Sequence, residues 1–152
     1  MQAALPVRQD DFHSGAFLKS RTLTVTIELA PDRVYAFASN PENLPSWAAG
    51  LGRTIGEGDG EWIVETANGP ISVRFAAENQ LGVLDHVVTL ESGQEILVPM
   101  RVVPNGAGSE VIFTLFQKAE MSDEQFTHDA QLVEQDLKTL KALLELRCRE
   151  PT

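Results

Sequence analysis

The sequence is 152 residues long, 43% of its residues are hydrophobic, and its formal net charge at pH 7 is −10. This length and apolar content predict a single domain with one core. The excess of 22 acidic over 12 basic residues argues against nucleic acid and anionic membrane surfaces as partners, because phosphate groups bind to clustered positive charge.

The first twenty residues have mixed polarity without a clean period, and we interpret them as an N-terminal arm. Such an arm can pack on another subunit, which leaves a homodimer open. The apolar core that a signal peptide requires is interrupted by Arg8, Asp10 and Asp11. No run of about 18 apolar residues is present, so we expect no integral membrane association. The sequence therefore predicts a cytoplasmic protein whose domain spans residues 21–148.

The first regular elements are a strand and two short helices. Apolar residues at positions 23, 25, 27 and 29 alternate with polar ones, which predicts a half-buried strand. Pro31 suits the first turn of a helix that ends before Asn40 and Pro41. A second short helical or turn-like segment is expected from Leu44 to Ala49.

Turn signals then predict an antiparallel meander. They occur at Gly58-Asp59-Gly60, Asn68-Gly69, Leu81-Gly82, Ser92-Gly93 and Asn105-Gly106. The strands between and after them are expected at residues 61–67, 70–79, 85–91, 95–103 and 110–118. Pro99 lies inside one of these strands and cannot donate a backbone hydrogen bond, so we expect an edge or a bulge there.

A long amphipathic helix is predicted at the C-terminal end. Ser122 and Gln125 form a capping box at its start. Its apolar seam consists of Phe126, Ala130, Val133, Leu137, Leu140 and Leu144. Only about three heptads are present, so packing on the sheet is a better interpretation than a coiled coil.

This order of elements resembles the START-like or SRPBCC superfamily over residues 21–146. The most telling stretches are Ala30–Phe37 and Asn40–Trp47, which look like the helix pair of that superfamily. The resemblance implies an α+β helix-grip fold, in which a curved antiparallel sheet of about seven strands wraps around the C-terminal helix. It also implies an apolar pocket between sheet and helix, as in relatives that bind lipids, sterols, quinones or polyketides.

His86 is the main polar candidate for this pocket. Alternation places it on the same strand face as Val88. Imidazole changes charge near neutral pH, so His86 can bond a ligand or act as a catalytic acid or base. A structural histidine bonded to neighbouring backbone is the alternative interpretation.

The other predicted ligand-binding residues are apolar or aromatic, with membership of the core as their alternative role. They are Trp62, Val64, Val73, Phe75, Val88, Met100, Val133 and Leu137. No two histidines share metal-ligand spacing, and the only cysteine, Cys148, cannot form an intrachain disulfide. We therefore predict no metal site and no cofactor.

Three functions are consistent with the sequence. The first is binding, or transport, of a small hydrophobic or amphipathic ligand between the sheet and the C-terminal helix. The second is a cyclase or dehydratase activity on a polyketide-like substrate, with His86 as acid or base. The third is a protein-interaction module like the branch of the superfamily that assists a chaperone ATPase.

Overall fold

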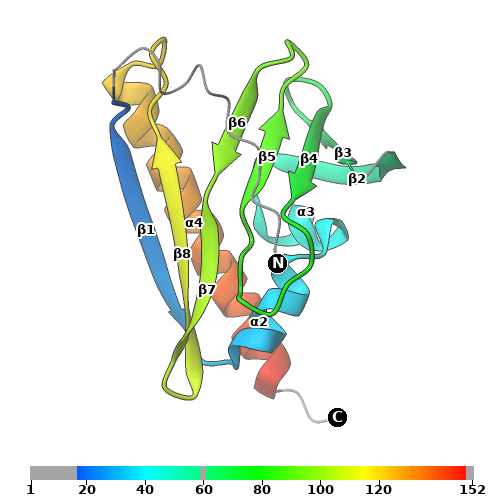
Figure 1. The fold of residues 1–152 in the computed structure, drawn as a ribbon, viewed down its shortest axis with the longest axis vertical. Coiled ribbons are helices and arrows are strands. Elements are labelled where there is room, and N and C mark those ends of the chain that lie inside the picture. Colours follow the sequence, from blue (N-terminus) through cyan, green and yellow to red (C-terminus); the bar gives the residue numbers. More distant parts are fainter. Residues whose placement is uncertain (1–16, 59–60, 150–152) are drawn as a thin grey trace.

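The computed structural model describes residues 17–58 and 61–149. Its elements are β1 Ser20–Ile27, α2 Pro31–Ala38, the 3₁₀ helix η1 Pro41–Asn43, α3 Leu44–Trp47, β2 Leu51–Gly58, β3 Glu61–Thr66, β4 Ile71–Phe75, β5 His86–Thr89, β6 Glu95–Val98, β7 Met100–Asn105, β8 Gly108–Phe116 and α4 Asp123–Arg149. The eight strands of the described residues form two antiparallel sheets, of five and three strands, instead of the predicted single sheet of about seven. The two sheets together curve around α4, which packs against β1 (Figure 1). The predicted α+β helix-grip class is confirmed. Most of the predicted arm, up to residue 16, and the side chain of Cys148 lie outside the described residues.

Pro99 divides one predicted strand into two. β6 pairs with β5, whereas β7 pairs with β8. The Pro99 carbonyl accepts the backbone N–H of Thr114 at 3.0 Å, while the proline itself has no N–H to donate. At this residue the chain therefore leaves the five-stranded sheet, of order β2-β3-β4-β5-β6, and enters the three-stranded sheet, of order β1-β8-β7. The predicted interruption at Pro99 is confirmed.

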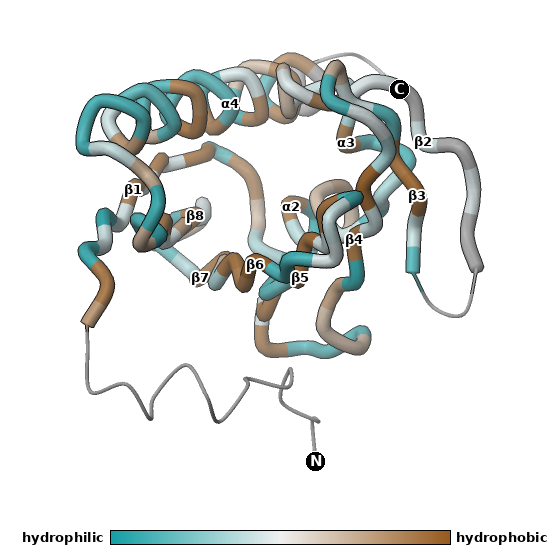
Figure 2. Tube along the Cα trace, turned by 90° about the horizontal axis from the view of Figure 1, so that it is seen from above, coloured by the Kyte–Doolittle hydropathy of each residue, from teal (hydrophilic) through white to brown (hydrophobic). Residues whose placement is uncertain are grey.

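α4 lies across the open side of the curved sheet (Figure 2). Ser122 Oγ accepts the backbone N–H of Gln125 at 3.0 Å, so the helix begins where its cap was predicted. The Gln125 amide donates to Asp129 instead of completing the capping box. The predicted seam faces the interior. Val133 is half-buried, and the other five residues of the seam are buried: Phe126, Ala130, Leu137, Leu140 and Leu144.

The main hydrophobic core joins α2, α3, β1, β7, β8 and the second half of α4. Leu140 is completely buried at its centre, and Met100 and Leu137 also belong to it. Val64 on β3 and Val73 on β4 are buried as well, but they lie outside this cluster. Phe75, at the end of β4, packs against the main core and connects this part of the sheet to it.

The segment between β4 and β5 differs from the prediction. A strand was expected to continue to Asn79, but β4 ends at Phe75. The Asn79 side chain donates to the carbonyls of Ala77 and Val83, both at 3.0 Å, and accepts the backbone N–H groups of Leu81 and Val83 at 2.9 and 3.0 Å. An asparagine side chain that forms hydrogen bonds with nearby backbone groups competes with strand pairing. These residues therefore form a loop instead of continuing β4.

The turn between β3 and β4 is displaced by one residue from its predicted position. Thr66 and Gly69 exchange both backbone hydrogen bonds, at 3.2 and 3.1 Å, so Ala67 and Asn68 are the central residues. Gly69 follows them with a φ of 107°, a conformation that glycine adopts without a steric penalty. The prediction that Asn68 and Gly69 form the centre of a two-residue turn was wrong, because Pro70 cannot donate the closing hydrogen bond.

Candidate functional site

Strand pairing brings most of the predicted site residues onto one face of the sheet. Trp62 lies opposite Val73, and Val73 lies opposite Val88. Two residues further along each strand, and so on the same face, Phe75 lies opposite His86. Directly opposed residues of antiparallel strands share a face. This is the inner face, since Phe75 packs against the core to which Leu137 of α4 contributes.

His86 is anchored in one tautomer by the backbone. Its Nδ1 lies 2.9 Å from the carbonyl oxygen of Leu84. A carbonyl oxygen only accepts, so Nδ1 carries the hydrogen and Nε2 is the unprotonated nitrogen. Burial lowers the pKa of His86, and this effect outweighs the Leu84 hydrogen bond and the nearby Asp85 charge, which both raise it. His86 is therefore neutral at pH 7, and no described residue forms a hydrogen bond with Nε2.

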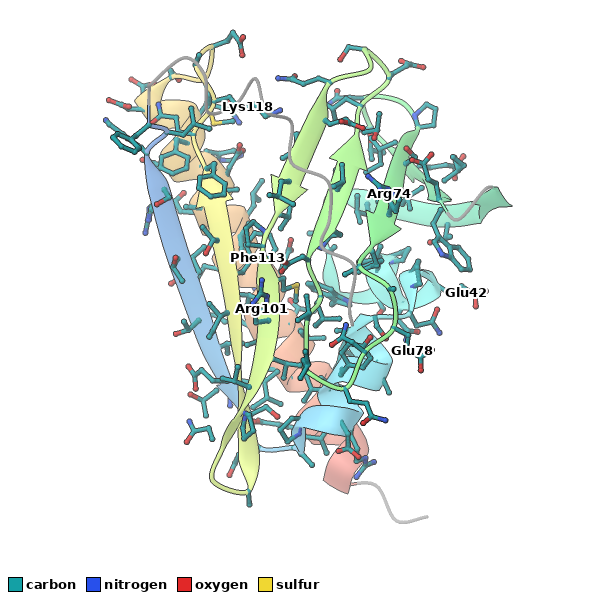
Figure 3. The ribbon with its side chains drawn as sticks, in the orientation of Figure 1. Glu42, Arg74, Glu78, Arg101, Phe113 and Lys118 are labelled. Atoms are coloured by element: carbon teal, nitrogen blue, oxygen red, sulfur yellow. The ribbon has the colours of Figure 1, made fainter. Side chains whose placement is uncertain are left out.

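Two aromatic rings surround the imidazole. The ring centroid of Phe75 is 5.0 Å from that of His86, and the ring of Phe113 meets His86 edge-on at 6.5 Å. Phe113 lies on β8 at the middle of the sheet (Figure 3). The free acceptor nitrogen of His86 thus lies in an apolar, aromatic environment, where a hydrogen bond is stronger than in water.

Asp85, which precedes His86, points to the outer face and forms an ion pair. Its carboxylate accepts Nε and Nη2 of Arg101 at 2.9 and 2.8 Å, together with the backbone N–H of Met100 at 2.8 Å. Burial raises the pKa of the Asp85 carboxyl, but the Arg101 and Met100 hydrogen bonds and the Arg101 charge lower it by more. The Asp85 carboxylate therefore links the residue before His86 to the backbone just after Pro99.

The structure separates the predicted ligand-binding residues into two groups. Val64, Val73, Met100 and Leu137 are no more than 2% exposed, as expected of core residues. Trp62, Phe75, His86, Val88 and Val133 are only half-buried, although all of them belong to the inner face or to the seam of α4. The second group is the better candidate for ligand contact, because its surface is not fully covered by protein.

A cleft that the sequence did not predict lies between α2 and the loop that joins β4 to β5. Its volume is about 940 Å³, and Phe75 is the one predicted site residue among those that line it. Its walls include Tyr35 of α2, Asn79 of the loop and Val102 of β7. The sequence predicts the turn at Leu81-Gly82 but extends the preceding strand to Asn79, and this hides the part of the loop that contains Ala76 and Glu78. Asn79 followed by Leu81-Gly82 is the pattern that indicates the loop.

The described residues show neither a metal centre nor a membrane span. No three histidine, cysteine, aspartate or glutamate side chains among them are grouped so as to hold a metal ion. Likewise, no helix in the described part of the chain combines the length and the apolar character needed to cross a bilayer.

Comparisons with known proteins identify the fold. No protein-family model and no curated protein matches the sequence. XoxI from Bacillus cereus is 20% identical and superposes with a TM-score of 0.66 over 84% of this chain and 97% of its own. Ara h 8.0201 is 14% identical, with a TM-score of 0.63 over 84% of this chain and 97% of its own.

A third solved structure is the di-domain ARO/CYC BexL from the BE-7585A biosynthetic pathway. It is 14% identical and has a TM-score of 0.65 over 87% of this chain, which corresponds to 48% of the di-domain protein. This chain has the helix-grip fold of these structures. The resemblance inferred from the sequence is confirmed for the fold. Sequence identities this low do not show the function, which is argued from the side chains of this chain.

His86→Phe is expected to reduce the pH dependence of stability between about pH 7.5 and 5.5. In the unfolded chain histidine titrates near its ordinary pKa of 6.5, whereas burial lowers the pKa of His86 in the folded protein. The free energy of unfolding is therefore highest above about pH 6.5 and decreases as the pH falls toward the folded-state pKa, because the unfolded state binds the proton first. Urea unfolding at both pH values measures this. An equal decrease in both proteins would contradict the assignment.

Proposed function

We propose that this helix-grip protein binds a small amphipathic molecule between the inner face of the sheet and α4. The observation that carries the proposal is the unpartnered Nε2 of His86 between the rings of Phe75 and Phe113. A neutral imidazole nitrogen accepts a hydrogen bond, so the ligand is expected to carry a hydroxyl or N–H group on an apolar body. The half-buried surface of Trp62 and Val88 would contact that body.

The fold supports this proposal without specifying the ligand. Helix-grip proteins enclose space between a curved sheet and a long helix, and in this chain α4 lies across the open side of the curve (Figure 2). The acidic net charge of −10 disfavours a strongly anionic ligand. A neutral aromatic or polycyclic alcohol has the chemistry that matches His86 and its neighbours.

A second candidate function is catalysis of a cyclisation or dehydration on a polyketide-like substrate. The same observation favours it, because an unprotonated Nε2 that is held in place by the Leu84 carbonyl can accept a proton from a bound substrate. The fold shared with the ARO/CYC protein BexL is consistent with this activity. Conversion of a bound substrate into product, rather than its unchanged release, would distinguish catalysis from binding.

The first experiment is native mass spectrometry of gently purified protein, followed by identification of any released molecule. The second compares 2-naphthol with naphthalene, two fluorescent probes of similar shape that differ in one hydroxyl group. We expect wild-type protein to bind 2-naphthol roughly threefold to tenfold more tightly, because its hydroxyl can donate to His86 Nε2.

His86→Asn provides the matched variant for this experiment. An asparagine amide can still donate to the Leu84 carbonyl, but it does not reach the position of Nε2. The preference for 2-naphthol over naphthalene is therefore expected to disappear, while naphthalene affinity changes little. If neither probe binds wild-type protein, or if the preference survives in His86→Asn, the proposal is wrong.

A further inference from the structure

The cleft between α2 and the β4–β5 loop has the size of a ligand site. Its volume of about 940 Å³ lies at the upper end of the range for small-molecule pockets. Leu84 and Val102, two buried core residues, form part of its apolar lining, and Phe75 lines it as well. Phe75 also contacts His86, so this one residue belongs both to the lining of the cleft and to the inner face.

The loop that forms one wall is fixed on both sides. The hydroxyl oxygen of Tyr35 on α2 accepts the backbone N–H of Asn79 at 3.1 Å. On the other side, the carbonyl of Gly82 accepts the backbone N–H of Val102 at 2.9 Å. The Asn79 side chain then holds the intervening residues through four hydrogen bonds. The cleft is therefore formed before any ligand arrives, which lowers the cost of binding.

The charge of the cleft has one sign. Asp32 on α2 and Glu78 on the loop both line it, and among its described lining residues there is no lysine, arginine or histidine. Glu78 lies where the loop passes α2 (Figure 3). A cleft lined by charges of one sign concentrates the opposite charge. The ring of Tyr35 adds an aromatic surface of the kind that attracts cations.

The rim also exposes an apolar side chain. Leu81, at the tip of the loop, is 72% exposed although it lines the cleft. A bound molecule with an apolar body would cover this surface, and its positive end would lie near the two carboxylates. We propose that the cleft is a second binding site, for a small organic cation with an apolar body. This site differs from the inner-face site around His86 and does not depend on it.

The test uses three probes that share an eight-carbon chain: octyltrimethylammonium, 1-octanol and octanoate. Each is titrated into the full-length protein while the backbone amide signals of Asn79, Leu81 and Gly82 are followed by NMR. We expect octyltrimethylammonium to bind about tenfold more tightly than octanoate, with 1-octanol between them, and we expect high salt to reduce the difference.

Asp32→Asn and Glu78→Gln are each expected to weaken octyltrimethylammonium binding about threefold. Glu134→Gln, which removes one exposed carboxylate from α4, is the matched control and should have no effect. Shifts centred on other amides, equal affinity for the three probes, or equal weakening by Glu134→Gln would each overturn the proposal. His86→Asn should leave octyltrimethylammonium binding unchanged, so failure of the inner-face site and failure of this site give different results.

Discussion

Gly82→Ala is expected to lower the free energy of unfolding by about 2–5 kcal/mol. Gly82 has a φ of 75°, which is unfavourable for any residue with a side chain, and an added Cβ would lie 2.0 Å from the carbonyl oxygen of Val102. That oxygen belongs to the backbone of β7 and cannot move away without disturbing the adjacent strand pairing. Urea unfolding monitored by tryptophan fluorescence would give the change.

Gly93→Ala is the matched control for this prediction. Gly93 also has a positive φ, of 92°, but a Cβ built there meets nothing within 4 Å. Its substitution is expected to cost only the backbone term of about 1–2 kcal/mol. If the two substitutions had equal effects, the close approach of the loop to β7 would not be a feature of the folded protein.

Leu140→Ala is expected to lower the free energy of unfolding by about 2–5 kcal/mol. Leu140 is completely buried in the main core, on the helix that packs against β1. Removing three carbon atoms there leaves a cavity that the surrounding strands cannot fill without shifting. Chemical unfolding of the variant gives the value directly.

Leu132→Ala, at an exposed position of the same helix, is the control. Leu132 is 45% exposed, so its replacement should change stability by no more than about 0.5 kcal/mol. A comparable loss in both variants would mean that α4 is not oriented with its predicted seam toward the sheet.

Local patterns were sufficient to predict most of the fold. Alternation in β1 and the capped seam of α4 are signals that repeat over many residues, and each has one physical explanation in the burial of an apolar face. The same alternation placed His86 and Val88 on one strand face, and the pairing of His86 with Phe75 and of Val88 with Val73 agrees with this. Pro99 marked the break between β6 and β7 because the absence of an N–H group is a property of the residue itself.

The contacts around these elements could not be predicted in the same way. The ion pair of Asp85 with Arg101 joins residues 16 positions apart, and sequence spacing does not show that Pro99 brings their strands together. The turn at Leu81-Gly82 was predicted, but residues 76–79 of the same loop were wrongly assigned to a strand, because the four local hydrogen bonds of Asn79 that compete with strand pairing are not visible in the sequence. The cleft was missed for the same reason.

The sequence by itself determined the order of elements, the direction in which each amphipathic face points and the acidic character of the protein. These properties depend on short-range periodicity and on composition. Only the tertiary structure decided which inner-face residues are covered and which keep free surface, which aromatic rings contact His86, and that α2 and the β4–β5 loop enclose a cleft. Those properties depend on packing between segments far apart in the chain, and the free energy of such packing is not a property of any one segment.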